Sequence, residues 1–358
     1  MNEDCLKLTT YFGERDRTAD GLLSDELMDV YGGHRLKASI LMRGAEGFGR
    51  LHHMRSDRLL SLSEDLPVVS IAIDERRRIE AMLEPLLEID RHGLITLERA
   101  RLLSREIGTV QLPERLDEAT KLTIYIGRQD RVGGRPAYVA ISELLYRRGL
   151  AGATVLLGVD GTRAGRRFRA QFFGRNADVP MMIIAVGSGR WIAAVLPELG
   201  RLLREPLMTL ERVRVCKRHG ELLGRPHELP ATDKHGLALW QKLMIYTYHD
   251  DTYGGEQLHV ALIRRLSEAG AAGATCLDGI WGFHGDRVPH GDRVFQIRRQ
   301  IPVCTITIDT PERTAESFKV IDEITAERGL VTSEMVPALA AITETERHGG
   351  LRLADHDF

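Results

Sequence analysis

The chain has 358 residues, enough for two or three domains, and its 43% hydrophobic content is typical of proteins with a packed core. Basic and acidic residues nearly balance, 49 against 51, for a formal net charge of −2. This balance argues against a dedicated nucleic-acid-binding protein, which usually has a strong excess of basic residues. No apolar run is long enough for a membrane helix, the N-terminus lacks the pattern of a signal peptide, and the four cysteines form no CxxC pair, so we expect a cytoplasmic protein with neither a zinc knuckle nor a redox pair.

Three segments of the chain open alike and close alike. The openings are KLTTY from Lys7, KLTIY from Lys121 and KLMIY from Lys242, at offsets of 114 and 121 residues. The closing segments are TLERAR at residues 96–101, TLERVR at 209–214 and a weaker TSE at 332–334. Glycine pairs and a proline before an apolar run lie between them in the same order, so the chain is predicted to contain three tandem copies of one unit.

Within each copy the pattern predicts strand, helix, strand, strand, helix, strand. In the first copy, Asp74 is a candidate N-cap for a helix over residues 79–87, and Pro85 should kink it. In the second copy, strands are expected at residues 122–126, 154–157, 181–186 and 208–215. Helices are expected at 137–148, beginning near Pro136, and around 191–199, where Pro197 should produce a kink.

This βαββαβ order predicts an α+β chain of three ferredoxin-like repeats, each with a four-stranded antiparallel sheet and two helices on one face. The repeats are expected at residues 5–102, 120–216 and 241–336. Residues 103–119 and 217–240 are expected to be linkers, and 337–358 a C-terminal tail.

The segments around the second strands carry a resemblance to a known family. They are residues 149–155 (GLAGATV) with 158–161 (GVDG), 272–276 (AGATC) with 279–283 (GIWGF), and 44–49 (GAEGFG) with 62–69 (LSEDLPVV). They resemble the PII-like family catalogued as domain of unknown function 190, here as three tandem copies that cover about four-fifths of the chain.

The resemblance implies a trimer-like arrangement, here an internal pseudo-trimer in a chain that is itself monomeric. It implies a non-catalytic signalling protein that binds a small anionic effector, foremost an adenine nucleotide, in the clefts between repeats. It also implies that the loop between the second and third strands contacts a partner protein, and it suggests a membrane transporter or channel among the candidates. No other cofactor is expected.

The glycines at the end of each second strand are candidate ligand contacts, because successive backbone N–H groups near glycines can form an anion nest. The alternative is that they only form turns or bulges at a strand end. The candidates, with adjacent aromatic residues, are Gly44, Gly47, Phe48, Gly49, Gly158, Gly161, Gly279, Gly282 and Phe283.

Arginines near these strands are further candidates, because guanidinium groups bind phosphate oxygens or acidic surfaces. Those expected to contact the ligand are Arg15, Arg17, Arg128, Arg131 and Arg163. Those expected to contact a partner are Arg55, Arg58, Arg166, Arg167, Arg169, Arg287 and Arg293. In both sets the alternative is a solvated charged surface.

The third copy has His249, Asp250 and Asp251 where the other copies have arginines after the first strand. Because these carboxylates would repel an anion, we expect the three clefts to be unequal.

Two alternatives to an effector-binding protein remain open. His52 and His53 are the best candidates for a metal-binding pair, and they favour a metal-responsive protein of the copper-tolerance type. Against this, adjacent residues of a strand point to opposite faces, and no carboxylate or cysteine lies at a convincing ligand interval. A scaffold without a ligand is the other alternative. No nucleophile–base pair or cofactor fingerprint occurs, so we expect no catalysis and assign no metal site.

Overall fold

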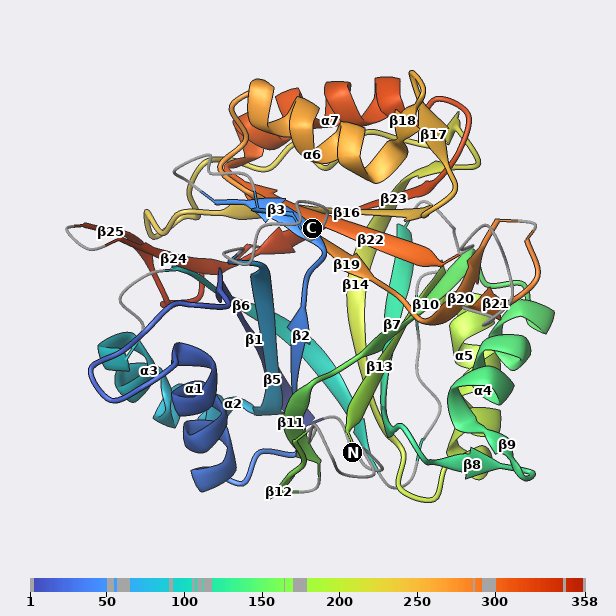
Figure 1. Cartoon of the computed structure of the whole chain (residues 1–358), viewed down its shortest axis with the longest axis horizontal. Coiled ribbons are helices and arrows are strands. Elements are labelled where there is room, and N and C mark those ends of the chain that lie inside the picture. The colour runs from blue at the N-terminus through green and yellow to red at the C-terminus, as the bar shows by residue number, and fades with distance from the viewer. Residues whose placement is uncertain are drawn as a thin grey trace.

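The computed structural model describes residues 3–49, 55–56, 65–89, 93–104, 107, 112, 118–163, 165–169, 179–285, 287–291, 301–343 and 346–356. Within these ranges each repeat contributes a sheet, the three sheets face one another around a common axis, and the helices lie outside (Figure 1). Strand pairings between repeats join the three sheets into one continuous sheet.

The first repeat has four main strands, two short strands and three helices. They are β1 (Glu3–Gly13), α1 (Leu23–Gly33), β2 (Ala38–Arg43), β3 (Glu46–Phe48), β4 (Arg55–Ser56), β5 (Pro67–Glu75), α2 (Arg76–Ala81), α3 (Leu83–Ile89) and β6 (Gly93–Ser104). The second helix expected in this repeat is divided into α2 and α3 at Met82, one turn before Pro85. The N-cap prediction was wrong: Glu75 holds that position, and the buried Asp74 accepts hydrogen bonds from the backbone N–H groups of Glu75 and Lys37.

The second repeat follows the same order. Its elements are β7 (Glu118–Gly127), β8 (Arg131–Val132), β9 (Arg135–Pro136), α4 (Ala137–Arg147), β10 (Gly152–Leu157), β11 (Asp160–Arg163), β12 (Arg166–Arg167), β13 (Pro180–Ser188), α5 (Gly189–Leu202), β14 (Leu207–Arg218) and β15 (Glu221–Leu222). The predicted strands and helices of this copy are confirmed. All nine residues of β13 are buried, as its unbroken apolar run indicated, and Pro197 lies within α5.

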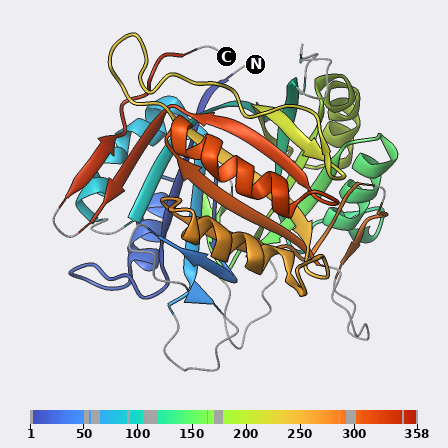
Figure 2. The same cartoon turned by 90° about the horizontal axis from the view of Figure 1, so that it is seen from above.

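The third repeat adds a C-terminal hairpin. Its elements are β16 (Trp240–Tyr248), β17 (Thr252–Tyr253), β18 (Glu256–Gln257), α6 (Leu258–Glu268), β19 (Ala274–Asp278), β20 (Trp281–His284), β21 (His290–Gly291), β22 (Pro302–Asp309), α7 (Pro311–Ile324), β23 (Leu330–Val336), β24 (Ala338–Ile342) and β25 (Arg347–Gly350). Thr310 caps α7 by accepting from the backbone N–H of Arg313. Figure 2 shows α6 and α7 side by side over the outer face of this sheet.

Each sheet has the strand order expected of a ferredoxin-like unit. The first pairs β6 with β1, β1 with β5 and β5 with β2, all antiparallel. The second has the equivalent order β14, β7, β13, β10, and the third has β23, β16, β22, β19. The fold class is therefore confirmed.

Strand pairing between repeats closes the ring. After each second strand, a short strand pairs with a neighbouring repeat: β11 with β2, β20 with β10 and β3 with β19. The end of each last strand also pairs with the beginning of the next repeat's last strand, β6 with β14 and β14 with β23. The third such seam is formed by β24, which pairs with β6. Residues 338–342, expected in a tail, therefore complete the ring.

The apolar residues form four clusters that follow from this arrangement. Three lie between a sheet and its helices, and the fourth, which includes Ile40, Met182 and Ile306, is shared by the inner faces of all three sheets. Because this inner cluster draws on every repeat, no repeat completes the core alone.

Candidate functional site

A ring of buried ion pairs surrounds the central axis. The axial ring consists of Lys7, Lys121 and Lys242 from the first strands and Glu98, Glu211 and Glu334 from the last strands. Within each repeat, the lysine lies directly opposite the glutamate across the strand pair. The segments that open each repeat contain the three lysines of the axial ring, and the segments that close each repeat contain the three glutamates.

Each lysine of the axial ring contacts two glutamates, one from its own repeat and one from the next. Lys121 Nζ lies 3.0 Å from Glu211 Oε2 and 2.5 Å from Glu334 Oε2. Lys7 bridges Glu98 and Glu211 in the same way, and Lys242 bridges Glu334 and Glu98. The six side chains thus form a closed, alternating and electrically balanced ring.

The pKa shifts in the axial ring show which forces oppose each other. Burial disfavours ionisation of Glu98 and Glu334, but the lysines outweigh it and lower the pKa of both carboxyl groups. The glutamates likewise outweigh burial for Lys7 and Lys242 and raise the pKa of both. At Lys121 burial prevails and lowers the pKa.

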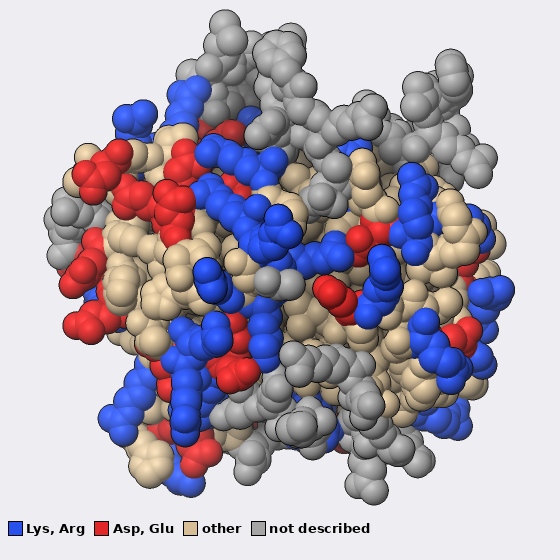
Figure 3. Space-filling model, turned by 90° about the horizontal axis from the view of Figure 1, so that it is seen from below, with Lys and Arg blue, Asp and Glu red and all other residues tan. Residues whose placement is uncertain are grey.

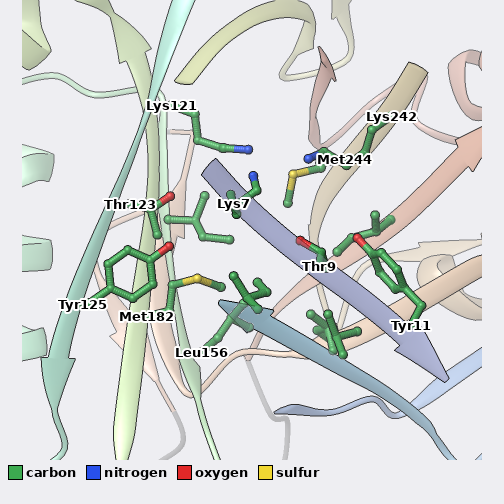
Figure 4. A pocket seen from close by; sticks show the side chains of 15 residues that line it. Lys7, Thr9, Tyr11, Lys121, Thr123, Tyr125, Leu156, Met182, Lys242 and Met244 are labelled. Carbon is green, nitrogen blue, oxygen red and sulfur yellow. The ribbon is translucent and has the colours of Figure 1, made fainter. Parts of the chain in front are cut away.

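A small cavity adjoins the axial ring (Figure 4). Its volume is about 30 Å³, space for a single water molecule. The ring lysines, Thr9, Thr123 and apolar side chains from the inner faces line it. In the described part of the chain, the ring glutamates are the one group of three side chains close enough to share a metal ion. Because three lysines already balance their charge, a divalent ion would leave a buried positive excess; the arrangement suits a structural role.

A larger pocket lies at the seam between the second and third repeats. It has a volume of about 410 Å³, within the usual range for small-molecule sites. The second repeat contributes the end of β14 and the third repeat contributes the turn after β16, the end of β20 and the start of β23. Its lining is Arg218, His219, Tyr248, Asp251, His284, Gly285, Arg287, Glu327, Arg328, Gly329 and Leu330. We call it the seam pocket.

Charge in the seam pocket is partly balanced, with a cationic excess. Arg287 and Arg328 both contact Asp251 Oδ1, at 3.4 and 3.2 Å, and Arg287 also lies 3.1 Å from Asp250. Among the described lining residues, Arg218, Arg287 and Arg328 thus face two acidic residues, Asp251 and Glu327. The two carboxylates expected to repel an anion are paired with arginines, and the inequality of the three clefts stays a prediction.

The turn after each first strand explains why Asp251 is fixed. Its Oδ2 accepts from the backbone N–H of Tyr248 at 2.8 Å. Asp16 and Asp130 accept in the same way from Gly13 and Gly127, at 2.7 and 2.9 Å. The offsets of 114 and 121 residues relate the three aspartates, so the turn is a repeated feature, whereas Tyr248 stands where the other copies have glycine.

Aromatic stacking fixes the wall of the seam pocket. The ring of His284 stacks on Tyr248 with centroids 3.8 Å apart, and the Arg287 guanidinium lies 4.4 Å from the centroid of the same tyrosine. The Tyr248 hydroxyl also accepts from the backbone N–H of His284 at 2.9 Å. At the equivalent place in the second repeat, Arg163 lies against Gly127 and pairs with Asp130 at 3.0 Å.

The candidate glycines lie in the seams between repeats. The backbone N–H of Gly158 donates to the Pro180 carbonyl and that of Val159 to the Leu41 carbonyl of the first repeat. The N–H groups of Gly44 and Gly279 are bonded in the same way, to Pro67 and Pro302. A Cβ on Gly47 would lie 2.6 Å from the Ala274 carbonyl oxygen of the third repeat. Gly161 and Gly282 are as close to the backbone of a neighbouring repeat.

These contacts correspond to the turn-and-bulge alternative, with a specific reason for glycine: the strands of two repeats approach too closely for a side chain. Nothing within 4 Å would meet a Cβ on Gly49, which lies at the end of this segment. Ligand binding by these glycines stays a prediction.

The two candidate phenylalanines are buried in the cores of other repeats. Phe283 of the third repeat packs with the helices of the second and makes an edge contact with Tyr146. Phe48 of the first repeat packs into the core of the third. Both side chains stabilise the seams and do not line the seam pocket.

The candidate arginines are dispersed. Arg287 lines the seam pocket, whereas the exposed Arg15, Arg17, Arg128 and Arg131 do not. Arg167 binds Asp160 and the α1 residues Asp25 and Asp29, and Arg169 pairs with Asp25, so these guanidinium groups join the β11–β12 hairpin to the first repeat. Arg166 is exposed, and Arg55 pairs with Gly47 through its backbone. Figure 3, which views the end of the molecule where β12 lies, shows acidic groups among the basic ones.

Several predicted residues lie outside the described residues: Arg58, Arg293, His52 and His53. Sequence reasoning missed most of the seam pocket, including Arg218, His284 and Arg328. These three belong to separate elements, and no motif joins them.

The fold and its seams define a class: a closed pseudo-trimer of ferredoxin-like units within one chain. Comparison with known families agrees, because the family described as uncharacterized ACR, domain of unknown function 190, matches residues 5–102, 119–215 and 240–338. The chain belongs to this family.

Individual relatives add the following. A UPF0166 protein of Aquifex aeolicus is 30% identical over 98 residues, which are 27% of this chain and 90% of that protein. Among solved structures, an aspartate kinase from Synechocystis aligns with a TM-score of 0.26 and 11% identity, over 96% of this chain and 45% of that one. An unknown protein from Galdieria sulphuraria aligns with a TM-score of 0.19 and 12% identity, over 61% of this chain and 98% of that one. These scores carry no argument about fold or function.

In the described residues, no helix is long and apolar enough to cross a membrane.

Proposed function

We propose that this protein is a non-catalytic PII-like sensor that binds a small anionic effector, foremost an adenine nucleotide, in the seam pocket. The observation that carries the proposal is the pocket itself, about 410 Å³ at a junction of two repeats with three arginines in its wall. Guanidinium groups bind phosphate oxygens with directional, charge-assisted hydrogen bonds.

The effector would compete with the ion pairs now present. Arg287 and Arg328 contact Asp251, so a phosphate group that enters would share these guanidinium groups or take them from the carboxylate. Arg287 lies in the segment between β20 and β22, which corresponds to the loop expected to contact a partner. Ligand binding would therefore alter the loop that we propose engages a partner protein, with a membrane transporter or channel as a candidate.

Calorimetry with ATP, ADP, AMP and inorganic phosphate tests this proposal. Loss of one charge-assisted hydrogen bond costs about 1.5–3 kcal/mol, so Arg328→Gln should weaken binding of the best ligand by about 10- to 150-fold. Arg264→Gln is the matched control, because Arg264 is an exposed, ion-paired arginine of α6 in the same repeat. Absence of binding to the unmodified chain, or equal loss in both variants, would overturn the proposal.

A further inference from the structure

A buried histidine with one unused nitrogen faces the seam pocket. His284 is 7% exposed, lines the pocket, and its Nε2 has no hydrogen-bond partner. Stacking on Tyr248 and the backbone hydrogen bond to the tyrosine hydroxyl hold the ring in place. A buried polar atom without a partner is uncommon in folded proteins. Its place in a pocket wall indicates that the partner belongs to a ligand.

The protonation state of His284 follows from its surroundings. A hydrogen bond from the His284 ring to the backbone of Thr247 favours the protonated ring. Because Nε2 is unpartnered, we infer that Nδ1–H is the donor of this bond. Burial is the largest influence and, with the nearby Arg287, His290 and His219, lowers the pKa of His284 to about 3. The ring is thus neutral at physiological pH, with its proton on Nδ1 and a lone pair on Nε2.

A lone pair cannot donate a hydrogen bond to an anion, so neutral His284 cannot bind an anion through Nε2 unless it gains a proton. Burial is the main reason that the ring stays neutral, and Arg287, His290 and His219 add to it. The other charged or titratable groups described around the ring are Arg218, Arg328, Asp250, Asp251, Glu327 and the Tyr248 hydroxyl. An anion bound among the three arginines opposes these influences, because it adds negative charge beside the imidazole where water is excluded.

We propose that an anion bound in the seam pocket carries one proton with it, shared between an oxygen of the ligand and Nε2 of His284. This inference rests on the proposed function and adds its regulation: binding strengthens as the pH falls. The proton comes from solvent or from an acidic hydroxyl of the ligand, and no bond to carbon or phosphorus changes. When the proton comes from solvent, the complex holds one proton more than its separate parts, so affinity falls by up to tenfold for each unit rise in pH.

Inorganic sulfate separates the two sources of the proton, because it carries none at neutral pH. We expect the affinity of the unmodified chain for sulfate to fall, by up to about tenfold per unit, as the pH rises from 6 to 8. Calorimetry in buffers of different ionisation enthalpy should give uptake approaching one proton per bound sulfate. The imidazole nitrogen resonances of His284 should change from the neutral to the protonated form on addition of sulfate.

His284→Gln and His259→Gln form the variant pair. Glutamine places an amide near Nε2 without a titratable group, so the pH dependence of sulfate affinity should be clearly smaller in the first variant than in the unmodified chain. His259 is also buried but lies outside the pocket, so its variant should keep the pH dependence.

The outcomes distinguish this inference from the function on which it rests. Binding to the unmodified chain without a pH slope, or an undiminished slope in His284→Gln, overturns the proton-linked mechanism and leaves effector binding intact. If neither sulfate nor a nucleotide binds, the proposed function falls and this inference with it.

Discussion

Neutralising one carboxylate of the axial ring should destabilise the protein far more than neutralising an exposed one. Glu334 is 3% exposed at its side chain, and its Oε2 accepts from Lys121 at 2.5 Å and Lys242 at 2.9 Å. Glu334→Gln keeps the shape but leaves the ring with three lysines and two carboxylates. Breaking a buried ion pair by removing one partner costs about 3–5 kcal/mol, because an uncompensated charge stays buried.

The expected change can be expressed as a melting temperature. An unfolding entropy of about 2.1 cal/mol/K per residue gives about 0.75 kcal/mol/K for the 358 residues if they unfold together. The loss then corresponds to a decrease of about 4–7 °C at the transition. Urea unfolding followed by circular dichroism provides the free energy, and calorimetry provides the temperature.

Glu143→Gln is the matched control for this prediction. Glu143 pairs with Arg135 at 2.5 Å in an exposed position, and such pairs contribute about 0–1 kcal/mol. The double variant Lys121→Met, Glu334→Gln restores a balanced ring, so its loss should be smaller than the sum of the two single losses. If Glu334→Gln costs no more than Glu143→Gln, the ring does not hold the three repeats together in the way that its geometry indicates.

Three further predictions follow from the same features. Gly282→Ala should lower the free energy of unfolding by at least about 1–3 kcal/mol, because the added Cβ would overlap the Ala153 carbonyl of the second repeat. The control Gly21→Ala places its Cβ in open space and should leave stability unchanged. The urea midpoints of the two variants provide the comparison. The pKa values of Glu98 and Glu334 are lowered on folding, so their contribution to the stability of the protein is fully present above the unfolded pKa of about 4.3 and is lost as the pH falls below it. The urea midpoint should therefore drop steeply below about pH 4. A flat profile between pH 3 and 7 would contradict this prediction. Nucleotide titrations should give fewer than three equivalent sites, because the second repeat has Gly127 and Arg163 at the positions of Tyr248 and His284. Three identical affinities would refute this prediction.

Much of the architecture could be predicted from the sequence because it depends on local patterns that recur. Alternating and continuous apolar runs define strands, helical spacing defines helices, and the repeated openings and closings define three copies. The same repeats contain the six residues of the axial ring. Their function as a ring could not be derived, since the cross-strand register that places Lys121 opposite Glu211 depends on how two strands 90 residues apart pair.

The seam pocket was beyond sequence reasoning for a different reason. Arg218 ends one strand, His284 ends another and Arg328 precedes a third, and they meet only because β14 of the second repeat pairs with β23 of the third. The glycines and Phe283 were predicted from the sequence as ligand contacts, and the tertiary structure places Gly47, Gly161, Gly282 and Phe283 against other repeats. The sequence by itself determines the repeated unit and its strands, since these follow from local spacing and apolar periodicity. Only the tertiary structure decides which distant charges become neighbours, because that depends on the closure of the three sheets around one axis.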